Sequence, residues 1–262
     1  GSYFNIKIYT SVEDVNKYIG EVGKFESQCS PRGAATILFV DPYNFGSVKL
    51  KEIKAFIRKY YCELIYNVFT SDFIRNIQND INNKKILECI GRNIKNIKTV
   101  EQLVVFIREE LTTGNIKHSF CYEFRTRTNT ELYQIMYFTP NFRGIKKLKV
   151  TLWEVFKGKL FHKNEKHEDE EYKQMSIFTE EDEAQWILSD RSREAKEKLL
   201  LRFANQRISY KEINVYLQCN TMMREGQIIT NILKPLIREG RLIKHNIQGK
   251  NDYKNDTYTI KE

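Results

Sequence analysis

The sequence predicts an α/β fold in which parallel strands are followed by a terminal antiparallel hairpin, with a smaller domain of helices and a second hairpin after it. The uninterrupted apolar run at residues 36–40 is typical of a parallel strand covered on both faces, and residues 62–69 predict a second buried strand. Residues 119–127 and 132–139 instead alternate between polar and apolar side chains, and residues 128–131 between them predict a hairpin turn. A chain of 262 residues with 41% hydrophobic residues can bury the core that such a fold needs.

Helices are predicted around these strands by apolar side chains at helical spacing. The chain opens with an alternating strand at residues 5–9, and a helix capped by Thr10 or Ser11 then runs to about Phe25. A helix at 50–60 separates the two buried strands, as in a sheet with right-handed crossovers. Further helices are predicted within 71–113, best formed at 100–111, and at 144–156, where the helix is basic and amphipathic.

The strand at 36–40 ends in a group of residues suited to binding a nucleobase. Ligands of open α/β sheets bind at the carboxyl ends of the strands, which is where Asp41 falls. The order of parallel strands and terminal hairpin is that of the second half of a Rossmann-like methyltransferase sheet, and in that class a short Asp/Asn-Pro-Pro-aromatic motif occupies this position. The Asp41 carboxylate can accept a hydrogen bond from an exocyclic amine, while a ring stacks on the base. The candidate catalytic residues are Asp41, Pro42, Tyr43 and Phe45.

A simpler interpretation of the same residues stays open. Asp-Pro also occurs in ordinary strand-to-helix turns, and both aromatic rings can serve only to pack over the end of the sheet.

Three stretches together resemble the three-Cys-motif partner family: FVDPYNFGSVKLKEIKAF, ELIYNVFTSDFIRN and CYEFRTRTNTELYQIMYFTPNFRGIKKLKVTLWEVF. The resemblance implies a methyltransferase-like domain that uses S-adenosylmethionine, and a Cys-rich partner protein, in a bacterial mobile-element or defence system. The turn Asp-Pro-Tyr-Asn-Phe-Gly is two residues wider than the family's Asp-Pro-Phe-Gly, so Tyr43 and Phe45 are both candidates for the stacking ring. The matching residues are Asp41, Pro42, Tyr43, Gly46, Asn67, Phe69, Lys149 and Trp153.

The donor-binding features of that family are missing from this sequence. The glycines at 20, 23, 33 and 46 form no glycine-rich strand-to-helix fingerprint. If residues 5–9 and 36–40 are the third and fourth strands of the order 3-2-1-4-5-7-6, two strands between them are absent and both edges lack partners. Gly1-Ser2 resembles the remnant of a cleaved tag. We therefore expect a longer natural protein or a second polypeptide to supply those strands, and we expect this chain alone not to bind S-adenosylmethionine.

The C-terminal part predicts a winged-helix domain. Three helices, at 191–205, 211–217 and about 222–239, precede a hairpin formed by 241–247 and 252–260. Such domains bind DNA through the third helix and the wing, but they also serve as protein-docking modules. The candidate nucleic-acid contacts are Arg224, Gln227 and Thr230 at the exposed start of the third helix, with Lys244, Lys250 and Lys254 on the wing.

Charge divides the chain into three parts that match the predicted domains. Residues 162–190 carry ten acids and three lysines, a net of −7, whereas 1–161 carry +9 and 191–262 carry +7. We interpret these parts as a partial methyltransferase-like domain, an acidic linker and the winged-helix domain. The linker is either a solvated loop or a nucleic-acid mimic that folds over a basic face. The two basic parts favour DNA or RNA as a partner.

Cysteines and apolar runs exclude several other classes of protein. The five cysteines include no C-x-x-C pair, which disfavours a disulfide framework or a zinc site and predicts a reducing, cytoplasmic location. His162 and His167 lie among acids in a predicted loop, and we expect no metal there. No apolar run is long enough to cross a bilayer.

Two functions follow as hypotheses. The first is a methyltransferase-like protein that transfers a methyl group from S-adenosylmethionine to an amine of a nucleobase. The second is a non-catalytic scaffold with a degenerate methyltransferase fold, which docks a protein or a nucleic acid.

Overall fold

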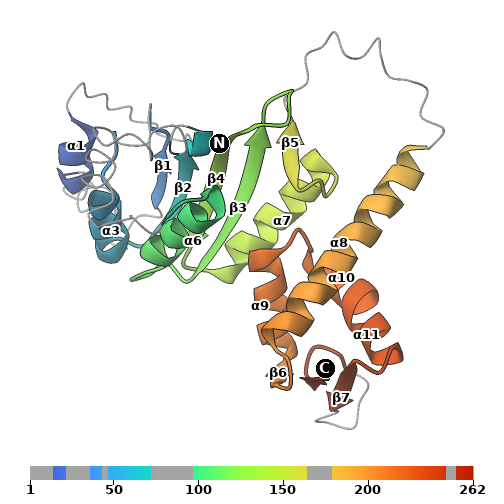
Figure 1. The fold of residues 1–262 in the computed structure, drawn as a ribbon. Helices are drawn as coiled ribbons and strands as arrows, with labels where there is room; N and C mark the ends of the chain where they lie inside the picture. The colour runs from blue at the N-terminus through green and yellow to red at the C-terminus, as the bar shows by residue number, and fades with distance from the viewer. Residues whose placement is uncertain are drawn as a thin grey trace, which may run out of the picture.

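The computed structural model describes residues 14–21, 36–42, 47–71, 73, 97–163, 179–245 and 252–261. They form two lobes, a sheet lobe up to residue 163 and a helical lobe from residue 179 (Figure 1). Several predicted features lie outside the described residues: the strand at 5–9, the cap at Thr10 or Ser11, most of 71–96, and Tyr43, Phe45, Gly46, His167 and Lys250.

The sheet lobe contains the predicted parallel pair and the predicted hairpin. β1 (Thr36–Val40) pairs in parallel with β2 (Cys62–Val68), while β3 (His118–Arg125) and β4 (Glu131–Thr139) are antiparallel. The second arm of the hairpin, β4, lies between β2 and β3, so the order is β1-β2-β4-β3-β5. β5 (Phe161–Lys163) pairs in parallel with β3 and crosses the predicted domain boundary at 161. A strand of three residues is too short to be predicted from a sequence pattern.

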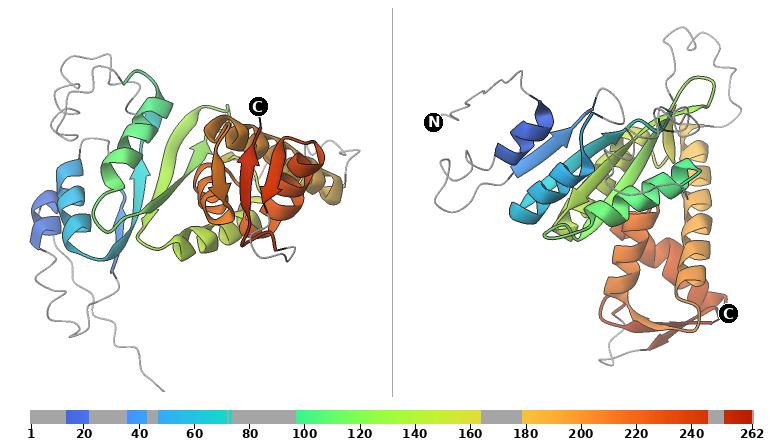
Figure 2. Two further views of the ribbon diagram at one scale, coloured as in Figure 1. Left: turned by 90° about the horizontal axis from the view of Figure 1, so that it is seen from below. Right: turned by 60° about the vertical axis from the view of Figure 1, so that its left-hand side comes forward.

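Helices cover the two faces of this sheet unequally (Figure 2). α3 (Leu50–Lys59) and α6 (Val100–Leu111) bury their apolar faces against one side, together with Ile19 of α1 (Val15–Glu21). α7 (Phe142–Phe156) packs on the other side, against side chains of β3. On that second side, Ile37 and Phe39 of β1 remain 67% and 62% exposed. The alternating exposure of β1 therefore departs from the predicted strand buried on both faces.

α7 ends in two consecutive residues with left-handed backbone. Its C-cap, Lys157, has a φ of 52°, and Gly158 follows at 82°. A Cβ added to Gly158 would lie 2.5–2.9 Å from the Trp153 ring. Glycine is required here both by the backbone and by the rigid indole.

We expect Gly158→Ala to destabilise the protein by about 3 kcal/mol, from about 1 kcal/mol of left-handed strain and about 2 kcal/mol of overpacking against Trp153. Gly240→Ala is a matched control, because Gly240 has a φ of 72° but nothing within 4 Å of the added Cβ. It should cost only the strain. Equal shifts of the two urea-unfolding midpoints would show that the contact with Trp153 is unimportant.

The helical lobe consists of helices and a three-stranded sheet. α8 (Glu180–Arg202) and α9 (Tyr210–Asn220) precede a continuous helical run of α10 (Glu225–Ile228), the π-helical turn η2 (Ile229–Leu233) and α11 (Lys234–Arg238). β6 (Arg207–Ser209), β7 (Leu242–His245) and β8 (Thr257–Ile260) form a sheet with the order β6-β8-β7. The strand β6 is an addition to the predicted two-stranded hairpin.

α8 begins eleven residues before the predicted start of the first C-terminal helix, inside the stretch interpreted as an acidic linker. Thr179 and Asp182 form a capping box, in which each side chain accepts a hydrogen bond from the backbone of the other residue. The acids that follow Thr179 suit the positive end of a helix dipole. The acidic residues from 180 onward therefore belong to a helix, whereas residues 164–178 of the predicted linker lie outside the described residues.

The two lobes are joined by donors of the sheet lobe that bind backbone carbonyls of the helical lobe. Lys149 Nζ and Trp153 Nε1, both on α7, donate to the carbonyl oxygens of Thr221 and Met222, each at 2.5 Å. Arg108 of α6 donates to the carbonyl oxygen of Cys219 at 3.1 Å. An apolar cluster beside these bonds contains side chains of both lobes: Phe120, Tyr122, Ile145, Leu152, Cys219 and Met222.

Candidate functional site

The carboxyl ends of β1 and β2 bring two polar side chains together. Asp41 directly follows β1, is exposed, and accepts a hydrogen bond from Asn67 Nδ2 of β2 at 2.8 Å. Because the two strands are parallel and in register, these residues lie side by side on the face that also carries Phe39. Asn67 Oδ1 is buried and accepts no hydrogen bond within the described part of the chain. A buried acceptor without a donor is costly and points to a ligand or another missing partner.

Aromatic rings adjoin this pair. Phe69 follows β2, and its ring centroid is 6.0 Å from that of Tyr133 on the neighbouring strand β4. Tyr133 in turn stacks on Phe124 of β3 at 4.8 Å and an angle of 14°. Burial, and secondarily the charge of Asp41, raise the pKa of Tyr133. The four residues Asp41, Asn67, Phe69 and Tyr133 are called the strand-end cluster below.

The structure places only some of the predicted catalytic residues in this cluster. Asp41 is exposed as predicted, whereas Pro42 is buried. Tyr43 and Phe45 lie outside the described residues. Tyr133 was missed, because it reaches Asp41 only through the insertion of β4 next to β2. Its place in an alternating strand predicted burial but not this neighbour.

Lys149 and Trp153, which match motif residues of the resembled family, lie in the joint between the lobes. Lys149 is fully buried, and its Nζ is 2.8 Å from the centroid of the Phe120 ring. Burial is the main cause that lowers the pKa of this lysine well below its ordinary value. Both residues therefore hold the lobes together.

The start of the third C-terminal helix is exposed only in part: Arg224 is exposed as predicted, whereas Glu225 contacts the sheet lobe. α10 begins against α7, where Glu225 forms an ion pair with Lys146 at 2.9 Å. The guanidinium of Arg224 lies 5.5 Å from the centroid of the Trp153 ring. The sheet lobe thus occupies part of the end of the helix that was expected to enter a DNA groove.

Of the other predicted nucleic-acid contacts, some are exposed and others already interact with residues of the helical lobe. Gln227 is buried and accepts a hydrogen bond from the Arg224 backbone N–H, so we remove it from the set. Lys244 is also removed, because its Nζ is 2.9 Å from the buried carboxylate of Asp256 and 4.0 Å from the centroid of the Tyr253 ring. Thr230 and Lys254 are exposed. Together with the exposed Arg224 these two remain candidates, while Lys250 is outside the described residues.

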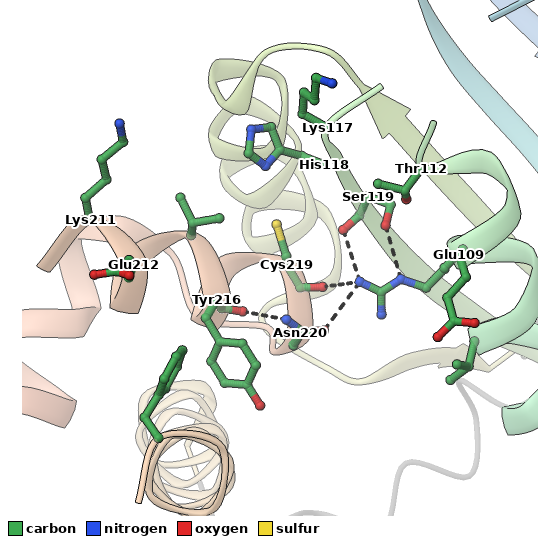
Figure 3. A pocket seen from close by; sticks show the side chains of 14 residues that line it. Glu109, Thr112, Lys117, His118, Ser119, Lys211, Glu212, Tyr216, Cys219 and Asn220 are labelled. Carbon is green, nitrogen blue, oxygen red and sulfur yellow. Dashed lines mark hydrogen bonds between the residues drawn. The ribbon is translucent and has the colours of Figure 1, made fainter. Parts of the chain in front are cut away.

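A cavity of about 840 Å³ lies between the lobes, lined by α6, the start of β3, and α9. Figure 3 shows His118 and Lys117 on the sheet-lobe side and Glu212, Tyr216 and Cys219 on the opposite side. Burial lowers the pKa of His118. Arg108, which also lines the cavity, is held by Ser119, Cys219 and Asn220. The walls of this cavity come from segments about a hundred residues apart, so no local sequence pattern predicted the cavity.

Comparisons with protein-family models, with curated proteins and with solved structures gave no significant match for this chain. The resemblance to three-Cys-motif partner proteins therefore stays a prediction.

The expectation that this chain alone does not bind S-adenosylmethionine stays a prediction. Neither Asp41 nor Asn67 lines the cavity between the lobes or the groove described below, and the sequence has no glycine-rich turn to hold the donor. Within the same residues, no group of three or more His, Cys, Asp or Glu side chains is arranged to hold a metal ion. None of the described helices combines the length and apolar character needed to cross a membrane.

Proposed function

We propose that this chain is the substrate-binding part of an S-adenosylmethionine-dependent methyltransferase-like protein that acts on an amine of a nucleobase. The observation that carries the proposal is the strand-end cluster, where the Asp41 carboxylate and Asn67 Oδ1, which accepts no hydrogen bond from the described residues, lie on the sheet face that carries the rings of Phe69 and Tyr133. The strand order β1-β2-β4-β3 supports it, because it corresponds to strands 4-5-7-6 of the Rossmann-like methyltransferase sheet.

In this proposal the chain binds and orients the base. An exocyclic amine has two N–H groups, which match the two acceptors Asp41 and Asn67 Oδ1. A base placed there can contact the rings of Phe69 and Tyr133, which compensates for removing it from a stack. Methyl transfer needs a donor site that the described residues do not provide, so we derive no chemical step through the donor.

The three helices and the sheet order β6-β8-β7 support a winged-helix assignment for the helical lobe, and we propose that this lobe contacts nucleic acid. Contact through the third helix is limited to its exposed residues, among them Arg224 and Thr230, and to Lys254 on the wing, because α7 covers part of the helix start.

Binding of nucleotides with and without an exocyclic amine tests the strand-end cluster. The chain should bind AMP or CMP more tightly than IMP and UMP, and Asp41→Ala should weaken the preferred nucleotide about tenfold, as expected for loss of a hydrogen bond to a charged group. Glu154→Gln, which removes an exposed carboxylate from α7, is the matched control and should change nothing. Isothermal titration calorimetry measures all four ligands. Equal binding of AMP and IMP that is insensitive to Asp41→Ala would contradict the proposal.

A non-catalytic scaffold is the second candidate, and the docked start of α10 favours it. Ion pairing of Glu225 with Lys146 turns the presumed DNA-reading end of the helical lobe toward the sheet lobe. A scaffold predicts no amine preference in the same titration.

A further inference from the structure

An open groove of about 630 Å³ separates the end of α7 and β5 from the first half of α8. The first turns of α8 project away from the helical lobe in Figures 1 and 2, and they form one wall. The other wall contains Lys157, Phe161 and Lys163. We propose that this groove binds single-stranded nucleic acid, with the backbone along its lysines and a base stacked on Trp186.

The exposed indole is the first argument. Trp186 lies on the groove wall formed by α8 and is 69% exposed, although a tryptophan ring is among the most costly side chains to leave in water. An aromatic ring in a basic groove is the feature by which proteins bind single strands, since every base offers a face for stacking. An exposed leucine, Leu201, shows that α8 also carries exposed apolar residues elsewhere, so exposure alone does not define the site.

The lysines are the second argument. Lys157, Lys159 and Lys163 line the same groove and are exposed. Lys159 lies 3.4 Å from Glu183 in a solvent-exposed ion pair, which costs little to break. Lys157 and Lys163 form no ion pair with any residue that the structure describes. Three cations opposite one aromatic ring suit a phosphate backbone with adjacent bases.

The local fold holds this wall in place. The left-handed residues Lys157 and Gly158 reverse the chain after α7, and Tyr122 Oη donates to the Lys159 carbonyl oxygen at 3.2 Å. The guanidinium of Arg125, on β3, lies 4.0 Å from the centroid of the Phe161 ring on β5. The lysines therefore project from a fixed turn and a paired strand.

A row of rings connects the groove with the strand-end cluster. The ring of His162, in the groove, lies 5.7 Å from that of Phe124, which stacks on Tyr133. A strand bound in the groove thus has an aromatic surface leading toward Asp41. This extension of the inference rests on the proposed function, whereas binding in the groove does not.

Fluorescence anisotropy of labelled 15-nucleotide DNA and RNA oligomers with the full chain tests the groove. Trp186→Ala should weaken binding about tenfold, the loss expected for one stacked base, while Trp186→Phe should retain part of the affinity. Leu201→Ala, which removes an exposed apolar side chain from the same helix, is the matched control and should have no effect.

The lysines are tested by the salt dependence of the same binding. The double variant Lys157→Gln/Lys163→Gln should weaken binding and reduce the slope of log K against log salt by about 1.4, at about 0.7 per phosphate contact. Lys51→Gln/Lys98→Gln removes two exposed lysines near α3 and α6 and should leave the slope unchanged. The DNA and RNA arms distinguish the two kinds of strand.

Three results would overturn the inference: no binding of either oligomer, binding that Trp186→Ala leaves unchanged, or displacement of the oligomer by a poly-glutamate peptide at equal charge concentration. The last result would identify a general anion surface. Asp41→Ala should leave oligomer binding in the groove intact, so failure of the nucleobase proposal and failure of this one are distinguishable.

Discussion

Replacing Lys244 with alanine is expected to destabilise the helical lobe by about 3 kcal/mol. Lys244 on β7 pairs at 2.9 Å with Asp256, whose side chain is 2% exposed. Removing one partner of a buried ion pair leaves the other charge buried without compensation. The resulting loss of folding free energy is larger than the net stabilisation that the intact pair provides. The urea-unfolding midpoint of the full chain, followed by circular dichroism, measures the change.

Lys254→Ala provides the control for this prediction. Lys254 is an exposed lysine of the same wing, two residues before Asp256, and its substitution should shift stability by less than about 0.5 kcal/mol. If the two variants unfold alike, Asp256 does not depend on Lys244. The comparison also matters for binding studies, because loss of DNA affinity in a Lys244 variant would reflect the fold of the wing and not a lost phosphate contact.

Lys149→Ala is expected to destabilise the joint between the lobes by about 2–4 kcal/mol. The lysine is fully buried, its stem packs in the inter-lobe cluster, and its Nζ donates to the Thr221 carbonyl oxygen. Truncation leaves a cavity and an acceptor without this donor. Lys149→Met keeps most of the volume and removes a buried amine, so it should cost about 1 kcal/mol or less.

The dependence on pH separates the charge of Lys149 from its packing. Burial lowers the pKa of Lys149 in the folded protein, so between that lowered pKa and the ordinary lysine value of 10.5 only the unfolded chain binds this proton. The unfolding free energy should therefore rise with pH in this window, by at most about 1.4 kcal/mol per pH unit.

Urea unfolding of the wild type and of Lys149→Met from pH 6.5 to 9 measures this difference. The wild type should gain stability relative to the variant as the pH increases. Measurements stop below pH 10 because burial raises the pKa of Tyr122, whose ionisation in the unfolded chain would oppose the trend. Parallel pH profiles would show that Lys149 binds its proton equally in both states.

Periodic patterns predicted the regular parts of this fold. The runs at 36–40 and 62–69 became β1 and β2, and the alternating runs became the β3–β4 hairpin with its turn at Thr126–Thr130. The helices α6 and α7 agree with their predicted ranges to within two residues. Each of these elements is long enough to repeat its own spacing several times, which makes the signal independent of the rest of the chain.

Features that depend on distant neighbours were not predictable in the same way. The charge of Asp41 acts on Tyr133 only because the strand order places β4 next to β2, and the groove beside Trp186 needs α7 and α8 to face each other. Gln227 and Lys244 are residue types that often contact nucleic acid. In this protein Gln227 caps the start of α10 and Lys244 pairs with Asp256, so both are engaged within the lobe. The exposed position of Asp41 could be predicted because the end of an apolar strand is a local property of the sequence.

The joint between the lobes has a consequence for how the C-terminal part can be exchanged. Arg108, Lys149 and Trp153 donate to main-chain carbonyl oxygens at positions 219, 221 and 222, so these three bonds depend on the course of the turn, while the Cys219 and Met222 side chains add apolar contacts. A foreign domain grafted after α7 should dock in the same pose if its corresponding turn follows the same path and keeps apolar side chains at the positions of Cys219 and Met222. The sheet lobe should therefore accept different C-terminal domains, because its three donors select the shape of the backbone that they bind.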